Sequence, residues 1–493
     1  MTGAAPDGDL AVLAEVQGVL IEVLESRNAA LEALVADLAE RLAKVERAVS
    51  RNSGNSSMPP SADDLPGKTA PEPKPGRSGK KRQGKQPGAP GAHLAWSENP
   101  DKAEHLFPAG PRACGADLAD AGDLGVAASH QVTDTSVVTA TVTQYDRHAV
   151  ACRCGRVHAA PRPAGAGEAG TVTYGLNLQA WAVFLLAVHH VPAERCEEVI
   201  AALTGTRPSD GWVHSMLARA AKAVRGVNML IRALVITAAV LCADETPIRV
   251  GPGPKTRKKY LLVACTHLLT YYFLGGRSMK TFDAFVFPDL SGSVIVYDRY
   301  QNYDAIQGVM HQLCCAHILR DLQDAAQAHP DAIWPGQAAE ALRALIHAAS
   351  TARKEGLAAV PDAGIAEDLR LFRNAVRVGL SEVRPVPGPN AKQKPGRTLL
   401  ECLHDREGDV LRFLSDLRVP PTSNQAERDL RPAKTQQKIS GRLRSEAATR
   451  NRYAIRGYTD TARKHRADII TAIRDALAGN PWMPPIPDTA QWR

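Results

Sequence analysis

The stretch from residue 233 to residue 313 constrains the fold more than any other part of this 493-residue chain. Three runs rich in β-branched and apolar residues follow one another with short polar connections: ALVITAAVLCADETPIRV, KKYLLVACTHLL and TYYFLGG. Such runs predict an antiparallel meander of three strands. A helical stretch, RSMKTFDAFVFPDL, precedes a fourth buried strand in SVIVYDRYQNYD, and MHQLCCAHILRDLQDAAQ predicts a short strand that continues into a helix.

This order of elements, β-β-β-α-β-α-β-α, predicts a ribonuclease-H-like arrangement, in which a mixed sheet carries helices on both faces. The first and fourth strands are neighbours in it, and each carries an aspartate, Asp244 on the first and Asp298 at the end of the fourth. A third carboxylate should come from a late helix, and Glu427 in TSNQAERDLRPAKTQQKISG is the candidate. We expect Ser423 or Asn424 to cap that helix.

Carboxylates that converge from separate elements repel one another unless cations lie between them. Magnesium prefers oxygen ligands and leaves coordination positions for water and phosphate, and two such ions can act on both oxygens of a phosphodiester displacement. We therefore expect two Mg²⁺ ions, replaceable by Mn²⁺, at these three carboxylates. Glu245 is expected to be a solvated or supporting acid, and Asp304 and Asp429 helix caps or surface ion pairs.

Residues 10–50 show a heptad pattern typical of a coiled coil that joins two copies of the chain. The two seam positions are occupied by Ile21, Asn28, Val35, Leu42 and Val49, and by Leu24, Leu31, Leu38 and Val45. An amphipathic helix packed on its own domain is the alternative. Residues 51–95, rich in Pro, Gly, Ser and Lys, predict a disordered linker. Its basic cluster suits DNA phosphates, unless the linker is merely solvated: Lys80, Lys81, Arg82 and Lys85.

Residues 96–165 predict a small module that resembles a zinc ribbon. Its candidate ligands are Cys114, Cys152 and Cys154. The sequence HQVTDTSVVTATVTQY between them predicts a strand pair. A tetrahedral zinc site needs a fourth ligand; Pro111 stands where a fourth cysteine would be expected, and His148 or His158 could complete the set. The alternative is a degenerate ribbon without metal.

Residues 171–232 predict a helical region that binds DNA. Helices over 193–203 and 211–225, joined by the turn TGTRPS, predict a helix-turn-helix, with Ser209 or Asp210 as the cap of the second helix. Side chains near the start of that helix would read DNA: Arg207, Trp212 and His214, with Ser209 and Ser215 beside them. A purely structural helix pair is the alternative.

The catalytic domain is predicted to comprise residues 233–328 and 416–466, split by a helical insertion over 329–415 and followed by a tail, 467–493. Three helical stretches predict the insertion: AAEALRALIHAASTARKEG, IAEDLRLFRNAVRVGL and EGDVLRFLSDL. Basic residues after the candidate glutamate are placed to hold DNA phosphates, although a solvated basic face would look the same: Arg431, Lys438, Arg442 and Arg444. The fold class is therefore multidomain α+β.

Four blocks resemble bacterial DDE transposases: D-E-T-P, Y-D-R-Y-x-x-Y, C-C-A-H-I-L-R-D-L, and N-Q-A-E-R-D-L-R-P with K-I-S-G. The resemblance is to the insertion-sequence family sixty-six (TnpC-type) and covers nearly the whole chain. It implies that Asp244, Asp298 and Glu427 form a metal-binding catalytic triad. It also matches Cys314 and His317 to a C-x-x-H element of such enzymes, whose alternative role is packing and hydrogen bonding.

The predicted function is therefore a transposase that cleaves and transfers DNA strands with Mg²⁺. Its expected partners are double-stranded DNA (element ends and target), a second copy or more of the chain, and accessory proteins of the same element. A formal charge of +8 agrees with a polyanionic partner. No apolar run reaches the roughly 18–20 residues of a membrane span, and the cysteine pattern favours a reducing cytoplasm. The rivals are a silent DNA-binding descendant of a transposase and a ribonuclease-H-like nuclease or resolvase.

Overall fold

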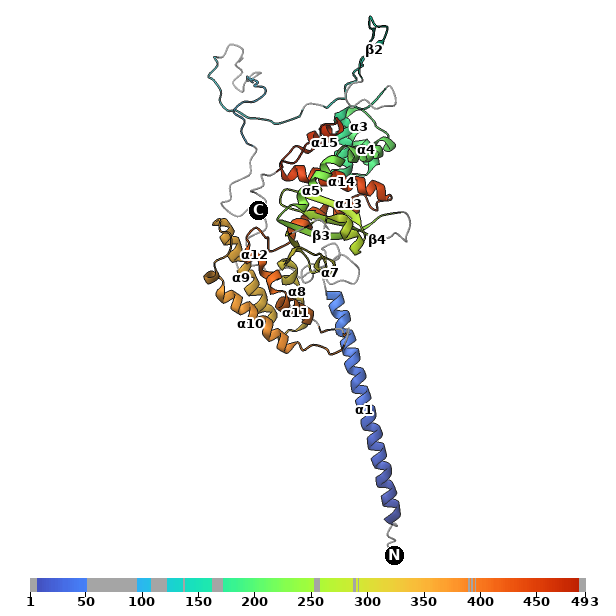
Figure 1. The fold of residues 1–493 in the computed structure, drawn as a ribbon, viewed down its shortest axis with the longest axis vertical. Coiled ribbons are helices and arrows are strands. Elements are labelled where there is room, and N and C mark those ends of the chain that lie inside the picture. The colour runs from blue at the N-terminus through green and yellow to red at the C-terminus, as the bar shows by residue number, and fades with distance from the viewer. Residues whose placement is uncertain are drawn as a thin grey trace, which may run out of the picture. The chain divides into compact units, whose positions relative to one another are not determined.

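The computed structural model describes residues 7–50, 95–107, 122–135, 138–161, 172–251, 258–286, 290, 292–388, 391, 393–394 and 396–486 (Figure 1). The basic cluster at Lys80, Lys81, Arg82 and Lys85 and the candidate zinc ligand Cys114 lie outside the described residues. The chain divides into two compact units, one of residues 1–72, 143–202 and 206–493 and the other of residues 73–142 and 203–205. No helix in the described part of the chain is long and apolar enough to cross a membrane.

Helix α1 (Asp7–Ser50) runs without interruption for 44 residues, as the heptad pattern predicts. The apolar side chains at both positions of the predicted seam are between 40% (Val49) and 64% (Val35) exposed. A helix that pairs with another copy through this seam would show such exposure in a single chain. Self-association through α1 stays a prediction.

One sheet of five strands organises the larger unit. Its strands lie in the order β5-β4-β3-β6-β7. Their bounds are β3 (Val240–Arg249), β4 (Lys258–Cys265), β5 (Thr270–Gly275), β6 (Val294–Tyr297) and β7 (Met310–Leu313). Strands β3, β4 and β5 pair antiparallel, whereas β6 runs parallel to β3 and to β7. The first and fourth strands of the predicted order, β3 and β6, are thus neighbours.

Helix α6 (Met279–Phe285) lies in the connection from β5 to β6 and helix α7 (Gln301–Asp304) in the connection from β6 to β7, while α8 (Cys315–Ala328) follows β7. The predicted start of the first strand, at Ala233, is wrong. Residues up to Ile236 complete helix α5 (Arg225–Ile236), because Ile231, Leu234 and Val235 recur at helical spacing and bury one face of it.

Four helices follow α8: α9 (Trp334–Lys354), α10 (Ala366–Glu382), α11 (Arg397–Asp405) and α12 (Glu407–Ser415), with a short 3-10 turn η4 (Asp362–Gly364) between α9 and α10. Figure 1 shows α8 to α12 gathered together. These helices share one hydrophobic core with the sheet, in which Leu313, Leu342 and Phe413 are buried. Helix α12 covers the edge strand β7, where Arg412 Nε donates a hydrogen bond to the His311 carbonyl at 2.8 Å.

A second hydrophobic core joins two distant parts of the sequence. Helices α2 (Leu176–Val183), α3 (Ala193–Thr204) and α4 (Asp210–Ala223), with the π-helical segment η2 (Phe184–Val188), supply its first half. Helices α14 (Glu446–Lys464) and α15 (Ile469–Leu477) supply the other half. Ile200 and Val213 are buried there with Ile455 and Ile473. The prediction of a tail from residue 467 is therefore wrong, because α15 buries an apolar face in this core.

The cysteine-bearing region differs from its prediction. The described residues within 130–145 form no strand and are mostly exposed, so their alternating Val and Thr residues have no partner surface to bury. A short antiparallel hairpin forms after them instead, from β1 (Ala149–Ala151) and β2 (Val157–Ala159). Cys152 and Cys154 lie in its turn region.

Candidate active site

The register of two parallel strands brings the two candidate aspartates together. The pairing of β3 with β6 ends with Cys242 opposite Val296. Two residues further along, Asp244 lies on β3 and Asp298 lies directly after β6. The two carboxylates are close enough that the charge of Asp298 raises the pKa of Asp244, after the larger effect of burial.

Helix α13 (Asn424–Ile439) covers the face of the sheet that carries Asp244. Asp244 pairs with Val263, and Val263 pairs with Tyr272, so the three side chains share one face. The Tyr272 hydroxyl donates a hydrogen bond to the carbonyl of Asp429 on α13. The first turn of the same helix carries Glu427, so all three candidate carboxylates belong to this side of the sheet.

Glu427 is held by two cations that come from α8. Its Oε1 atom lies 3.7 Å from His317 Nε2 and 3.7 Å from Arg320 Nη1. These distances are too long for hydrogen bonds, and the buried Oε1 atom has no hydrogen-bond partner among the described residues. Sequence reasoning missed Arg320, although it follows His317 by three residues, which is one helical turn.

The start of α8 is tied to the start of α13. The Cys315 amide donates to the Pro421 carbonyl at 2.9 Å, and the Ser423 amide donates to Cys314 Sγ at 3.2 Å. Ser423 is the N-cap residue of α13, but its hydroxyl makes no capping hydrogen bond. These contacts position His317 against Glu427.

Cys314 and His317 lie together at the buried start of α8, where His317 Nδ1 has no hydrogen-bond partner among the described residues. Burial alone would raise the pKa of Cys314, but the neighbouring His317 and the hydrogen bonds from Ser423 lower it. Burial would likewise lower the pKa of His317, yet the neighbouring Cys314, followed by the charges of Asp298 and Glu427, raises it to about 9. The imidazole is therefore a cation near neutral pH, facing the carboxylates.

Neither aspartate is neutralised by a cation of its own. Asp244 Oδ1 accepts the Glu245 amide at 2.8 Å, and Asp298 Oδ1 accepts the Tyr300 amide at 3.1 Å. Within the described residues, neither carboxylate forms an ion pair. Burial raises the pKa of Asp244 first, and the negative charges of Asp298 and Glu245 raise it further.

Glu245 is not a solvated acid, so of the two expectations for it the solvated one is wrong. Adjacent strand residues point to opposite faces, so Glu245 lies on the other side of the sheet from Asp244, and its side chain is 1% exposed. Arg277 Nε donates to its Oε1 at 2.9 Å, and the Tyr303 hydroxyl donates to its Oε2 at 2.8 Å. Arg277 also lies over the ring of Tyr300, 3.9 Å from its centroid.

Asp304 and Asp429, which are expected from the sequence to be helix caps or surface ion pairs, both form ion pairs. Asp304 Oδ1 lies 2.6 Å from Arg406 Nη1. Asp429 forms a buried rather than a surface ion pair: its Oδ2 lies 2.7 Å from Lys464 Nζ, and the two side chains are 8% and 13% exposed. Thr270 donates a further hydrogen bond to Asp429 at 2.8 Å.

The candidate site fits magnesium in the chemistry of its donors. The side chains of Asp244, Asp298 and Glu427 offer only oxygen atoms, which Mg²⁺ prefers, and the buried Oε1 of Glu427 has no hydrogen-bond partner in the described part of the chain. In the part of the chain that the structure describes, no group of three or more His, Cys, Asp or Glu side chains is arranged to hold a metal ion. The register of β3 and β6 thus brings Asp244 and Asp298 together. The third acid, Glu427, faces His317 and Arg320.

The predicted DNA-reading residues lie around the start of α4. Ser209 is its N-cap residue and accepts the Trp212 amide at 3.3 Å. Arg207 pairs with Glu197 on α3 at 3.0 Å. His214, 59% exposed, lies 3.8 Å from Asp210.

Trp212 is less available for contact with DNA than the sequence suggests. Its ring packs against Tyr174, with centroids 4.5 Å apart. Within the predicted trio, Arg207 and His214 therefore present the more accessible side chains.

A basic strip lies beside the end of β3. Leu443 forms a parallel bridge with Val250, and the Gly251 amide donates to the Leu443 carbonyl at 2.9 Å. The predicted phosphate-binding residues in and after α13 are all exposed: Arg431, Lys438, Arg442 and Arg444.

Two of the candidate zinc ligands, Cys152 and Cys154, lie near the turn of the β1–β2 hairpin. Cys152 and Cys154 are exposed free thiols, and hydrogen bonds with Cys154 lower the pKa of Cys152. His158 lies on β2, where it pairs with Val150.

Comparison with protein families gives two matches. A model described as Transposase IS66 family matches residues 171–451, which is more than half of the chain and includes the three acids. The chain therefore belongs to the IS66 family of transposases. A second model, Family of unknown function (DUF6444), matches residues 8–95. No curated protein matches the chain.

Proposed function

We propose that this protein is a metal-dependent transposase that cleaves a DNA strand at the end of an insertion sequence and joins the freed 3′-hydroxyl to a target strand. The observation that carries the proposal is the parallel register of β3 and β6, which brings Asp244 level with Asp298 beneath the helix that bears Glu427. The strand order is compatible with a ribonuclease-H-like fold. Membership of a transposase family supports a DNA-processing role.

Asp244, Asp298 and Glu427 would hold the metal. Mg²⁺, or Mn²⁺ in its place, would when bound activate an attacking oxygen and neutralise charge on the leaving oxygen. His317 and Arg320 keep Glu427 in position from α8. The side chain of Arg320 is 30% exposed, so its guanidinium can also contact a phosphate oxygen of the DNA.

The remaining residues would hold the DNA. Helix α4 would enter the major groove near Arg207 and His214, and the basic strip after α13 would contact phosphates beside the carboxylates.

Two chains joined through α1 would bring two element ends together in the bacterial cytoplasm. Light scattering on the full chain tests this assembly: Leu31→Glu is expected to reduce the dimer to a monomer, and an unchanged mass would refute the seam.

The enzymatic proposal is tested by a strand-nicking assay on duplex DNA that carries the inverted repeats flanking the gene. Asp298→Asn is expected to reduce the Mg²⁺-dependent nicking rate by more than about a hundredfold, because effects at metal ligands exceed those of their supporting residues. Asp283→Asn, which removes an exposed carboxylate from α6 of the same sheet domain, is the matched control and should nick normally. Equal rates for wild type and Asp298→Asn would refute the proposal.

A further inference from the structure

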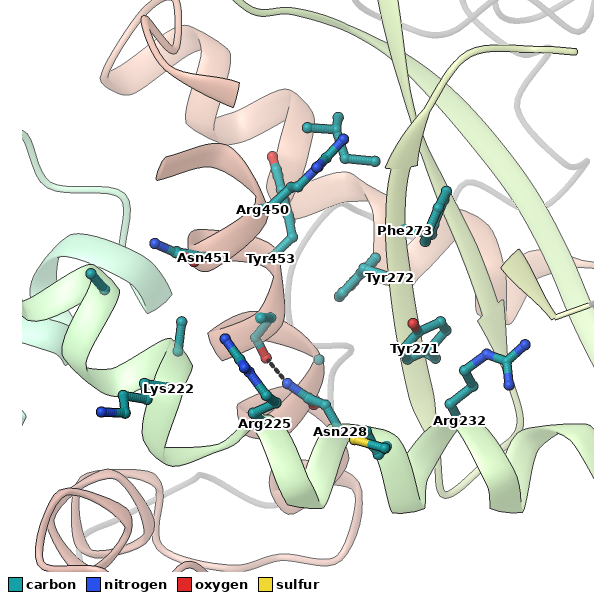
Figure 2. A pocket seen from close by; sticks show the side chains of 16 residues that line it. Lys222, Arg225, Asn228, Arg232, Tyr271, Tyr272, Phe273, Arg450, Asn451 and Tyr453 are labelled. Carbon is teal, nitrogen blue, oxygen red and sulfur yellow. Dashed lines mark hydrogen bonds between the residues drawn. The ribbon is translucent and has the colours of Figure 1, made fainter. Parts of the chain in front are cut away.

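A pocket of about 550 Å³ lies between helix α5, the edge strand β5 and helix α14 (Figure 2). Its volume is within the range of pockets that bind small ligands. Asn228 Nδ2 on α5 donates a hydrogen bond to the Ala454 carbonyl of α14 at 2.8 Å, which links two of its walls. All the lining residues belong to the larger unit. The pocket lies two strands away from β3, which carries Asp244.

The charge of the pocket favours an anion. Lys222, Arg225 and Arg450 are exposed lining residues, and none of the lining residues is acidic. Arg450 pairs with Glu446 at 2.7 Å. Lys222 and Arg225 form no ion pair within the described ranges. Figure 2 shows Lys222 and Arg225 on the α4–α5 side of the pocket and Arg450 on the α14 side.

Aromatic side chains supply a surface for a flat ring. Tyr271 and Phe273 are half-buried on one face of β5. Their rings pack against Phe285, with centroids 5.8 Å and 5.7 Å away. On the other face, Tyr272 packs against Tyr453 at 5.8 Å. Nucleobases stack on such rings with little dependence on their sequence.

Two polar atoms of the pocket residues have no hydrogen-bond partner among the described residues. They are Asn228 Oδ1 and the hydroxyl of Tyr453, a residue that is 3% exposed. Both atoms have almost no exposed surface, so a ligand reaches them only when the side chains around the pocket shift, and it could then recover the free energy that an unpaired polar group costs. The Tyr453 hydroxyl can donate and the Asn228 oxygen can accept, as the edge of a nucleobase requires.

We propose that this pocket takes one unpaired nucleotide of a DNA strand, with its base against β5 and its phosphate on Lys222 and Arg225. The inference rests on the proposed function in one respect, namely that DNA is the substrate. The position of the pocket supports it, because Lys222 lies at the end of α4, the candidate DNA-reading helix, and β5 belongs to the sheet of the candidate active site. A strand that leaves α4 toward Asp244 could present a base here.

Binding to three labelled duplexes tests the pocket in the full chain. The duplexes are identical except that one has a single unpaired thymine, one has an abasic nucleotide at that place, and one is fully paired. Fluorescence anisotropy should show about tenfold tighter binding to the unpaired thymine than to either of the others, since base stacking contributes a factor of this order. Equal affinities for all three would overturn the proposal.

Variants then assign the preference to this pocket. Lys222→Ala/Arg225→Ala and, separately, Tyr271→Leu should each abolish the preference for the unpaired thymine. The control Arg343→Ala/Lys354→Ala removes the same charge from the exposed face of α9 and should keep it. Tyr453→Phe removes a hydroxyl that has no hydrogen-bond partner within the described ranges, so the fold should be retained, and the preference should fall by a smaller factor.

The outcomes separate this proposal from the proposed function. If wild type nicks DNA while the pocket variants keep the full preference, the pocket proposal is wrong and the transposase proposal stands. If the pocket variants lose the preference while Asp298→Asn nicks like wild type, the catalytic assignment fails and the nucleotide site stands. In a last comparison, wild type and the pocket variants are tested for binding of a labelled acidic peptide. If the variants lost the peptide but bound the thymine-bearing DNA like wild type, the pocket would be assigned to peptide addition at the edge strand β5 and the proposal would be overturned.

Discussion

Two neighbouring carboxylates on β3 lie on opposite faces of the sheet and have opposite surroundings. On one face, Glu245 is enclosed by Arg277 and Tyr303, and the Arg277 guanidinium compensates its charge. On the other face, the one hydrogen bond to Asp244 among the described residues comes from the amide of the next residue, and the charge of Asp298 raises the pKa of Asp244. A carboxylate whose partners are complete stabilises the fold, whereas one left without a cation is available to a ligand.

Helix α13 shows the same contrast between two acids that are two residues apart, Glu427 and Asp429. Asp429 is held by Lys464, Thr270 and Gln425 in a buried network that joins α13, α14 and β5. Glu427 keeps an oxygen without a hydrogen bond, 3.7 Å from two cations. Removing a partner from the first kind of acid should therefore change stability, and altering the second kind should change activity.

The largest expected effect on stability is at the Asp429 network. Lys464→Met removes a cation that also donates to the carbonyls of Thr266 and Leu269 at 2.9 Å, and it leaves Asp429 charged and buried. The expected loss is about 3–5 kcal/mol in the free energy of unfolding, measured by urea denaturation. The double variant Asp429→Asn/Lys464→Met should recover part of this loss. A change below about 1 kcal/mol would show that the pair is not structural.

Glu427→Gln should give the opposite result. We expect its nicking rate to fall by more than about a hundredfold, with little loss of stability, because the buried Oε1 makes no hydrogen bond among the described residues and lies 3.7 Å from its two neighbouring cations. Asp429→Asn is the matched change on the same helix and should lose stability while it keeps nicking at low temperature. If both variants lost stability equally and neither lost activity, the contrast along α13 would be wrong.

A smaller effect is expected in the titration of His317. Its folded pKa, about 9, lies above the ordinary value, so the stabilisation by its cation is complete below about pH 6.5 and is lost as the pH rises through about 9. Cys314→Ala removes the neighbouring thiol that raises this pKa and should lower it. NMR titration of labelled histidines in the presence of a chelator measures the change, with His317→Gln for assignment. A pKa that stays at about 9 would assign the shift to Asp298 and Glu427 alone.

The sequence predicts the strand order because its apolar runs are short, rich in β-branched residues and separated by turns. It fails where the decisive contacts are distant. The run at 233–236 is equally apolar, but packing of α5 makes it helical. Helix α15 lies in a region assigned as a tail, because only the packing with residues such as Ile200 and Val213 reveals its buried face. Helix α11 was missed because it begins directly after a loop rich in Pro, Gly and Lys.

The candidate site was predictable to a similar extent. Asp244, Asp298 and Glu427 are predicted from strand order and late-helix position, whereas Cys314 and His317 are singled out only by the resemblance to transposases. The role of Glu245 was not predictable, because its partners Arg277 and Tyr303 lie 32 and 58 residues away along the chain. No local pattern distinguishes it from its neighbour Asp244.

The most direct test of the central claim compares those two neighbours. Asp244→Asn and Glu245→Gln each neutralise one carboxylate on the same strand, and their initial nicking rates are measured side by side on the same Mg²⁺-containing substrate, at a temperature where both are folded. We predict a loss of more than about a hundredfold for Asp244→Asn. Glu245→Gln should lose about 1–3 kcal/mol of stability and keep a rate within a few-fold of wild type. Full nicking by Asp244→Asn, or equal losses in both variants, would contradict the assignment of the active site to the Asp244 face of the sheet.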